Sequence, residues 1–176
     1  MTDTFDTETH LDFSRYSSLA DLLDHAFARH RGKTAFICLD KKTSFDEIER
    51  DSGRFAAYLQ HHTALKPGDR IAIQLPNLTQ FAIAAFGAIR AGMVLVNTNP
   101  LYTERELRHQ FKDSGAKALV ILADLLPTAE KVVPDTDIST VITTAAQDLI
   151  QPQETPASTL DTVSFGAVSR VEAGVS

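Results

Sequence analysis

The chain has 176 residues, of which 43% are hydrophobic and 23% charged, a balance typical of a globular protein that argues against global disorder. Its formal net charge is −6, and no basic patch indicates nucleic-acid binding. Acidic residues dominate the start of the chain, where no Lys or Arg precedes Arg15. We therefore expect residues 1–16 to form an acidic, flexible N-terminus.

The single cysteine, Cys38, lies in the apolar run 35–39, which favours a buried core thiol. One cysteine cannot form an internal disulfide, as fits a reducing compartment. The N-terminus lacks the basic and apolar regions of a signal peptide. The most apolar segment, 81–96, is interrupted by Arg90 and Gly92 and is short for a membrane span. We expect a soluble, cytoplasmic protein.

The first elements are a helix over 17–32, a short buried strand over 34–39 and a turn at 40–42. Ser18, followed three residues later by Asp21, resembles a capping box at the start of that helix.

Ser44 and Glu47 form a stronger capping box, which opens a second helix. Gly53 inside this helix costs about 1 kcal/mol relative to alanine. We expect close packing on a neighbour to compensate for that cost. The segment 81–89 is apolar nearly all round, which predicts a helix covered on more than one side.

Thr103 and Glu106 form a third capping box, and the helix that they open is expected to end at Gly115. Asp124 is expected to cap a further helix with Pro127 in its first turn.

Four predicted strands recur along the chain, with centres near Ile73, Leu95, Val120 and Val141. The centres are 22, 25 and 21 residues apart, with a helix in each gap. Helical crossovers of that size call for parallel strands in right-handed βαβ units. We predict an α/β fold over 17–149: a doubly wound, mostly parallel sheet with flanking helices.

From residue 150 onward the composition changes, and 150–176 is expected to be a low-order tail. Only a short strand at 162–168 is suggested by alternation. A linker, a disordered tail and the end of a truncated domain all fit this composition.

No catalytic, cofactor-binding or metal-ligating residue is predicted. The run Gly32-Lys33-Thr34 resembles part of a phosphate-binding loop, but the glycine required five residues earlier is replaced by Phe27, and the run joins a helix to a strand rather than a strand to a helix. No GxGxxG or GxSxG motif is present. The histidines are scattered, and His61-His62 suits the end of a helix.

Ligands of open α/β sheets gather at the carboxyl ends of the strands. Those ends are expected at residues 76–77, 97–99, 123–124 and 143–144. Asn97 and Asn99 can donate hydrogen bonds to a ligand there, although a role in stabilising turns is favoured.

Several short runs, each weak alone, occur in a specific order over residues 17–149. They are TSFDEI (43–48), FAAYL (55–59), LKPGDR (65–70), QLPN (74–77), AIRAG (88–92), VNTNPLYT (96–103) and DSGAKA (113–118). In this order they resemble the AMP-forming long-chain fatty-acid–CoA ligases of the acyl-adenylate-forming superfamily. The resemblance implies an incomplete part of the large N-terminal domain of such enzymes, and the tail 150–176 is expected to diverge from the family.

The resemblance also implies a reaction: ATP, Mg²⁺, a long-chain fatty acid and coenzyme A are used to form acyl-CoA, AMP and pyrophosphate. It implies a cytoplasmic enzyme with reversible, peripheral attachment to the inner membrane. The Ser/Thr/Gly-rich phosphate loop of the family, its ribose-binding aspartate and its C-terminal lysine lid are absent from this sequence. We therefore expect a fragment that is inactive alone and binds none of these cofactors tightly.

Two alternatives remain open. A small stand-alone α/β module that binds a ligand or a protein would need an intact pocket at the strand ends. A non-functional remnant of a truncated or frame-shifted gene would be poorly soluble, because its edge strands and apolar helix would lack cover.

Overall fold

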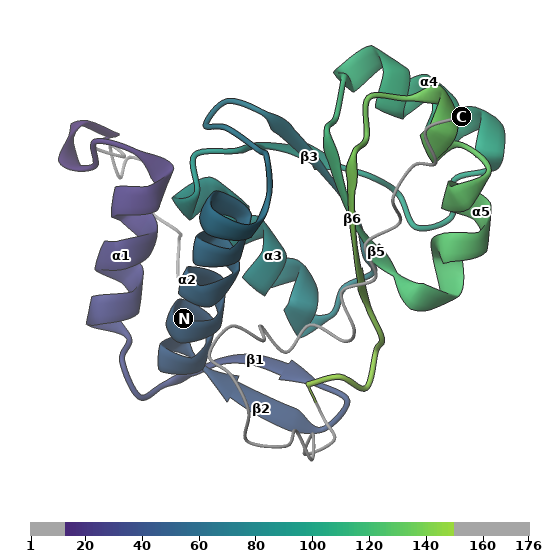
Figure 1. Ribbon diagram of the computed structural model, residues 1–176. Coiled ribbons are helices and arrows are strands. Elements are labelled where there is room, and N and C mark those ends of the chain that lie inside the picture. The colour runs from purple at the N-terminus through teal and green to yellow at the C-terminus, as the bar shows by residue number, and fades with distance from the viewer. Residues whose placement is uncertain (1–12, 150–176) are drawn as a thin grey trace, which may run out of the picture.

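The computed structural model describes residues 13–149. The fold is built around one parallel sheet of four strands in the order β4-β3-β5-β6 (Figure 1). The strands are β3 (Arg70–Gln74), β4 (Val94–Asn97), β5 (Ala118–Leu122) and β6 (Thr140–Thr144). All four predicted strands are thus confirmed. Their parallel pairing follows from the helix in each connection, since a short hairpin turn cannot join parallel strands.

Helices cover both faces of this sheet, as a doubly wound fold requires (Figure 1). One face is covered by α1 (Leu19–Arg29), α2 (Phe45–His62) and α3 (Thr79–Arg90), and the other by α4 (Glu104–Ser114) and α5 (Leu126–Glu130). Short 3₁₀ turns are η1 (Phe13–Arg15), η2 (Ala123–Leu125) and η3 (Val133–Asp135). Successive strand residues serve opposite faces: Ile71 and Ile73 pack with the first group of helices, and Ala72 packs with the second.

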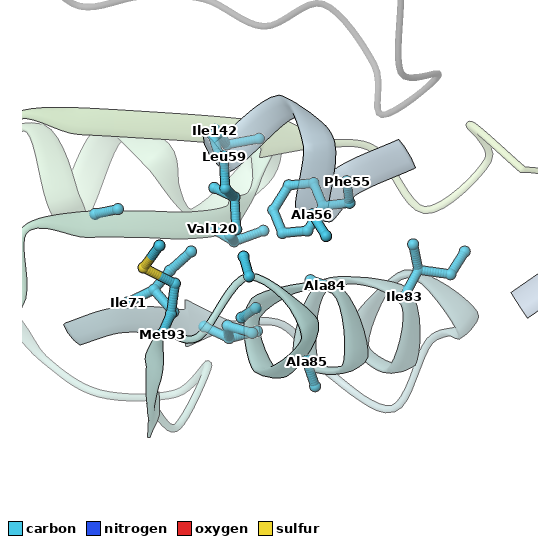
Figure 2. Packing of buried hydrophobic residues seen from close by; sticks show 14 of the residues in the cluster. Phe55, Ala56, Leu59, Ile71, Ile83, Ala84, Ala85, Met93, Val120 and Ile142 are labelled. Atoms are coloured by element: carbon cyan, nitrogen blue, oxygen red, sulfur yellow. The ribbon is translucent and has the colours of Figure 1, made fainter. Parts of the chain in front are cut away.

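The first core lies between the sheet and α3. Figure 2 shows the side chains of Phe55, Leu59, Val120 and Ile142 gathered beside α3, the helix that carries Ala84. Helix α3 is buried on most of its circumference, which confirms the prediction from its apolar sequence.

Helices α2 and α3 approach closely because glycine stands at their contact. A Cβ atom at Gly87 would lie 2.8 Å from both Phe55 Cδ1 and the Ser52 carbonyl oxygen. At Gly53 a Cβ atom would lie 3.3 Å from Arg90 Nη1. That nitrogen donates to the Glu49 carbonyl oxygen at 2.7 Å, so the space beside Gly53 is filled by a bound guanidinium.

The capping boxes at Ser44–Glu47 and Thr103–Glu106 are confirmed, each with reciprocal side-chain and backbone hydrogen bonds. Gly115 ends α4 with a left-handed φ of 58°.

Two other predicted helix caps are wrong in detail. The hydroxyl of Ser18 caps α1, but the carboxylate of Asp21 accepts from Ser17 instead of completing a box. Asp124 caps nothing, because the chain after β5 first makes the 3₁₀ turn η2 and α5 starts without a side-chain cap. Pro127 does fall in the first turn of α5, as predicted.

The segment 34–44 departs most from the prediction. It is an antiparallel hairpin, β1 (Thr34–Cys38) and β2 (Lys41–Ser44), and not a buried strand followed by a turn over 40–42. Leu39 and Asp40 make the turn with φ of 48° and 63°, as the tight turns of hairpins require.

Burial in the hairpin was also predicted wrongly. Ile37 is 68% exposed and Leu39 is 60% exposed, while Cys38 is only partly buried. The cause is that no element among residues 13–149 covers the outer side of the hairpin. Helix α1 is also shorter than expected and ends at Arg29.

The residues before 13, the tail 150–176 and the strand suggested at 162–168 lie outside the described residues.

Candidate functional site

The order of the strands places one switch point in the sheet. From β3 the chain passes to β4 on one side, whereas from β5 it passes to β6 on the other side. Strands β3 and β5 are neighbours, with Gln74 opposite Ile121. The connections that leave their carboxyl ends therefore diverge, and this is where open α/β sheets form their ligand crevices.

Gln74 is the polar group that stands out at this switch point. The residue is 1% exposed, and its Oε1 has no hydrogen-bond partner within residues 13–149. Gln110 of α4 has a second buried Oε1 without a partner, while its Nε2 donates to the Asn97 carbonyl oxygen at 3.0 Å. Sequence reasoning missed Gln74, although a glutamine that ends an otherwise apolar strand is a readable signal.

The loop after β6 is fastened to α3 by side chains that serve structure. Gln80 Nε2 donates to the Ala145 carbonyl oxygen at 3.0 Å, and Gln80 is 2% exposed. The carboxylate of Asp148 accepts from Thr144 Oγ1 at 3.0 Å and from the Ala145 N–H at 2.7 Å. These side chains form hydrogen bonds within the chain, and they hold the loop after β6 in place.

The two asparagines singled out from the sequence make structural contacts. Asn99 Oδ1 accepts from the Leu101 N–H at 3.0 Å, which is the expected role of asparagine in a turn. Asn97 is exposed and lends its backbone carbonyl to Gln110.

The Gly32-Lys33 pair does not fit a phosphate group. It lies between α1 and β1, and the Gly32 N–H donates to the carboxylate of Asp46. A phosphate would have to displace this carboxylate and would be repelled by it. This pair therefore does not form a cradle for a phosphate group.

Three carboxyls of the described residues have lowered pKa values and structural hydrogen-bond partners. The pKa of the Asp69 carboxyl is lowered, first by a hydrogen bond from Lys117 and then by one from the Lys66 N–H. The pKa values of Glu47 and Glu106 are lowered chiefly by the backbone N–H groups that they cap. Each shift is downward and has a structural partner, so none of these carboxyls is poised as a general acid or base near neutral pH.

The described part of the chain contains no group of three or more His, Cys, Asp or Glu side chains arranged to hold a metal ion. His61 and His62 lie in the last turn of α2, as predicted, and the His62 ring stacks on Tyr58 with centroids 5.8 Å apart. Between residues 13 and 149, no helix combines the length and apolar character needed to cross a membrane.

The AMP-binding enzyme family model matches residues 23–171. The chain is 46% identical over 143 residues to a long-chain-fatty-acid–CoA ligase of Escherichia coli O6:H1, and this match covers 81% of the chain and 26% of the relative. It is 36% identical over 133 residues to a long-chain-fatty-acid–CoA ligase of Bacillus subtilis, covering 76% of the chain and 24% of the relative.

Solved structures agree with these relatives. A long-chain-fatty-acid–CoA ligase from Archaeoglobus fulgidus superposes with a TM-score of 0.68 at 25% identity, covering 72% of this chain and 27% of that one. A benzoate CoA ligase from Burkholderia xenovorans gives the same TM-score and identity, covering 73% and 26%. The chain spans about a quarter of the length of the relatives that it matches. It belongs to the AMP-binding enzyme family, and its relatives are long-chain fatty-acid–CoA ligases.

Proposed function

We propose that this chain is the N-terminal part of the α/β scaffold of a long-chain fatty-acid–CoA ligase. The intact enzyme would join ATP, a long-chain fatty acid and coenzyme A to give acyl-CoA, AMP and pyrophosphate. The observation that carries the proposal is the 46% identity to a long-chain-fatty-acid–CoA ligase over 143 residues. The order of the motifs from residue 43 to residue 118 supports the same assignment.

The chain supplies structure to that enzyme rather than chemistry. Its polar groups at the carboxyl edge of the sheet are mostly tied to backbone partners, as Gln80 and Asp148 illustrate. Its one glycine–lysine pair holds a carboxylate in the place where a phosphate would bind. For these reasons the chain alone is proposed to be inactive and to bind ATP, Mg²⁺ and coenzyme A only weakly.

Acid-dependent exchange between ATP and labelled pyrophosphate tests this proposal. The purified chain should give no exchange above a protein-free control with palmitate and Mg²⁺, because the Ser/Thr/Gly-rich phosphate loop of the family is absent from this sequence. The intact Escherichia coli ligase serves as the positive control. Palmitate-dependent exchange by the chain alone would contradict the proposed inactivity.

The proposal includes a cytoplasmic location with reversible contact at the inner membrane, as the family resemblance implies. After cell lysis, the chain should divide between the soluble and membrane fractions and leave the membranes in high salt. Recovery solely from the periplasm would contradict this location.

A further inference from the structure

The face of the central sheet beneath α4 and α5 changes from apolar to polar toward its carboxyl end. One row of paired residues crosses this face and is apolar throughout: Val96, Ala72, Leu119 and Val141. Two residues further along the chain, the next row on the same face contains Thr98, Gln74, Ile121 and Thr143. Thr98 continues the pairing of β4, since its N–H donates to the Ile73 carbonyl oxygen at 3.0 Å. All four residues of this second row are buried, so polar side chains are enclosed there.

Gln74 needs a hydrogen-bond donor in this row. It lies on the inner strand β3 and is 1% exposed, and no donor within residues 13–149 reaches its Oε1. Its neighbours in the row do not serve, because Thr98 Oγ1 donates to the Val96 carbonyl oxygen at 3.4 Å and Ile121 is apolar. A buried amide oxygen without a donor is destabilising, and native proteins leave few of them. A donor from another source is therefore expected.

Gln110 of α4 brings a second amide oxygen to the same corner. Its Nε2 donates to the Asn97 carbonyl oxygen at 3.0 Å. A carbonyl oxygen can only accept, so the amide nitrogen of Gln110 must face it and the amide oxygen must point elsewhere. That Oε1 is buried and also finds no donor in the described part of the chain. Asn97 is paired with Ile73, the residue before Gln74, so both amide oxygens lie between α4 and the carboxyl ends of β3 and β4.

We infer that an ordered internal water molecule occupies this corner and donates one hydrogen bond to Gln74 Oε1 and the other to Gln110 Oε1. Acceptor oxygens also suit a cation, but both amides are neutral and a buried charge without a counter-charge is costly. Water has two O–H donors and no charge, and buried waters commonly serve polar groups that a chain leaves unsatisfied. The bridge connects α4 to the sheet at the switch point. The inference goes beyond the proposed function and does not depend on it.

NMR of the complete 176-residue chain, labelled with ¹⁵N, tests the inference. We expect cross-peaks between water and the side-chain amide protons of both Gln74 and Gln110, with NOE and ROE of opposite sign, as for water held inside a protein. Gln74→Met should abolish the cross-peak at Gln110, because one water molecule serves both amides. Gln110→Met should abolish the cross-peak at Gln74 for the same reason. The two reciprocal variants keep the test valid if one of them fails to fold, which its melting temperature would show.

Thr98→Val and Gln80→Met are the controls. Thr98→Val removes the neighbouring hydroxyl group, whose exchanging proton could imitate bound water, and both cross-peaks should persist in this variant. Gln80 is also a buried glutamine, at 2% exposed, but its Nε2 donates to the Ala145 carbonyl oxygen at 3.0 Å. Gln80→Met should therefore leave both water cross-peaks unchanged.

Three results would overturn the inference. The first is the absence of water cross-peaks from the wild-type chain, or their loss in Thr98→Val. The second is a cross-peak at Gln110 that persists in Gln74→Met, because the water would then not be shared. The third is a set of NOEs from a protein N–H group in place of water, because the donor would then be another part of the chain.

Discussion

The central sheet and the β1–β2 hairpin contain similar apolar strands in opposite surroundings. Ile73 in β3 is 0% exposed, because helices cover both faces of the sheet. Ile37 in β1 is 68% exposed, because the described chain covers one side of the hairpin only. The two regions show that an apolar strand sequence indicates a tendency to be buried, while the burial itself depends on which elements pack against the strand.

The largest expected effect on stability is at Ile73, and it can be compared directly with the effect at Ile37. Ile73→Ala should lower the free energy of unfolding by about 2–5 kcal/mol, since it leaves a cavity in a closed core. Ile37→Ala should lower it by about 0.5 kcal/mol or less, since the side chain is already in water. Urea denaturation followed by circular dichroism measures both. Equal losses would show that the hairpin is buried in solution.

The close contact between α2 and α3 should give the next largest effect on stability. Gly87→Ala should cost about 1–3 kcal/mol, because its new methyl group would lie 2.8 Å from the Ser52 carbonyl oxygen, which cannot move aside without shifting α2. Gly53→Ala is the matched control in the partner helix. Its methyl group would meet Arg90 Nη1 at 3.3 Å, a contact that a shift of a few tenths of an ångström would relieve without releasing the hydrogen bond to the Glu49 carbonyl oxygen. If Gly53→Ala lowered the free energy of unfolding as much as Gly87→Ala, the described packing of α2 on α3 would be contradicted.

The capping box of α4 should contribute less to the free energy of unfolding than the contact between α2 and α3. Thr103→Ala removes the hydroxyl that contacts the Glu106 carboxylate at 2.7 Å and the Glu106 N–H at 3.5 Å. We expect a loss of about 1 kcal/mol in thermal or urea unfolding. Thr103→Ser retains the hydroxyl and should remain close to the wild type. A full loss with serine would show that the methyl group of Thr103, and not the cap, matters.

The smallest effect expected is at the ion pair between Asp69 and Lys117, whose charged atoms are 2.7 Å apart. Asp69→Asn should cost about 0.5–1 kcal/mol at neutral pH. Because the pKa of Asp69 is lowered in the folded protein, its contribution is complete above the ordinary aspartate pKa and is lost as the pH falls through the lowered value. The difference between wild type and variant should therefore shrink below about pH 4. A difference that persists after Asp69 is protonated would contradict the role of its charge.

The central fold was predictable because its signals are local and its cover lies within the chain. The capping boxes at Ser44 and Thr103 mark helix starts through contacts three residues apart. The spacing of the strand centres determines parallel pairing, since each gap holds a helix.

The errors have a common physical origin. The turn was predicted at 40–42 instead of Leu39-Asp40, because a left-handed φ at Leu39 is not indicated by its residue type. The exposure of Ile37 depends on which other elements are present, and the pattern of one strand does not report that. At the switch point, the unpartnered Gln74 became visible only when the strand order was known.

Amide hydrogen exchange of the free chain, followed residue by residue by NMR, tests the contrast between the two regions most directly. We predict that the amides of Ala72 and Leu119, in the centre of the enclosed sheet, exchange slower than those of Phe36 and Ile37 by a factor on the order of 100. Equal protection of β1 and β5 would contradict the account, because the hairpin would then be fully covered by this chain alone.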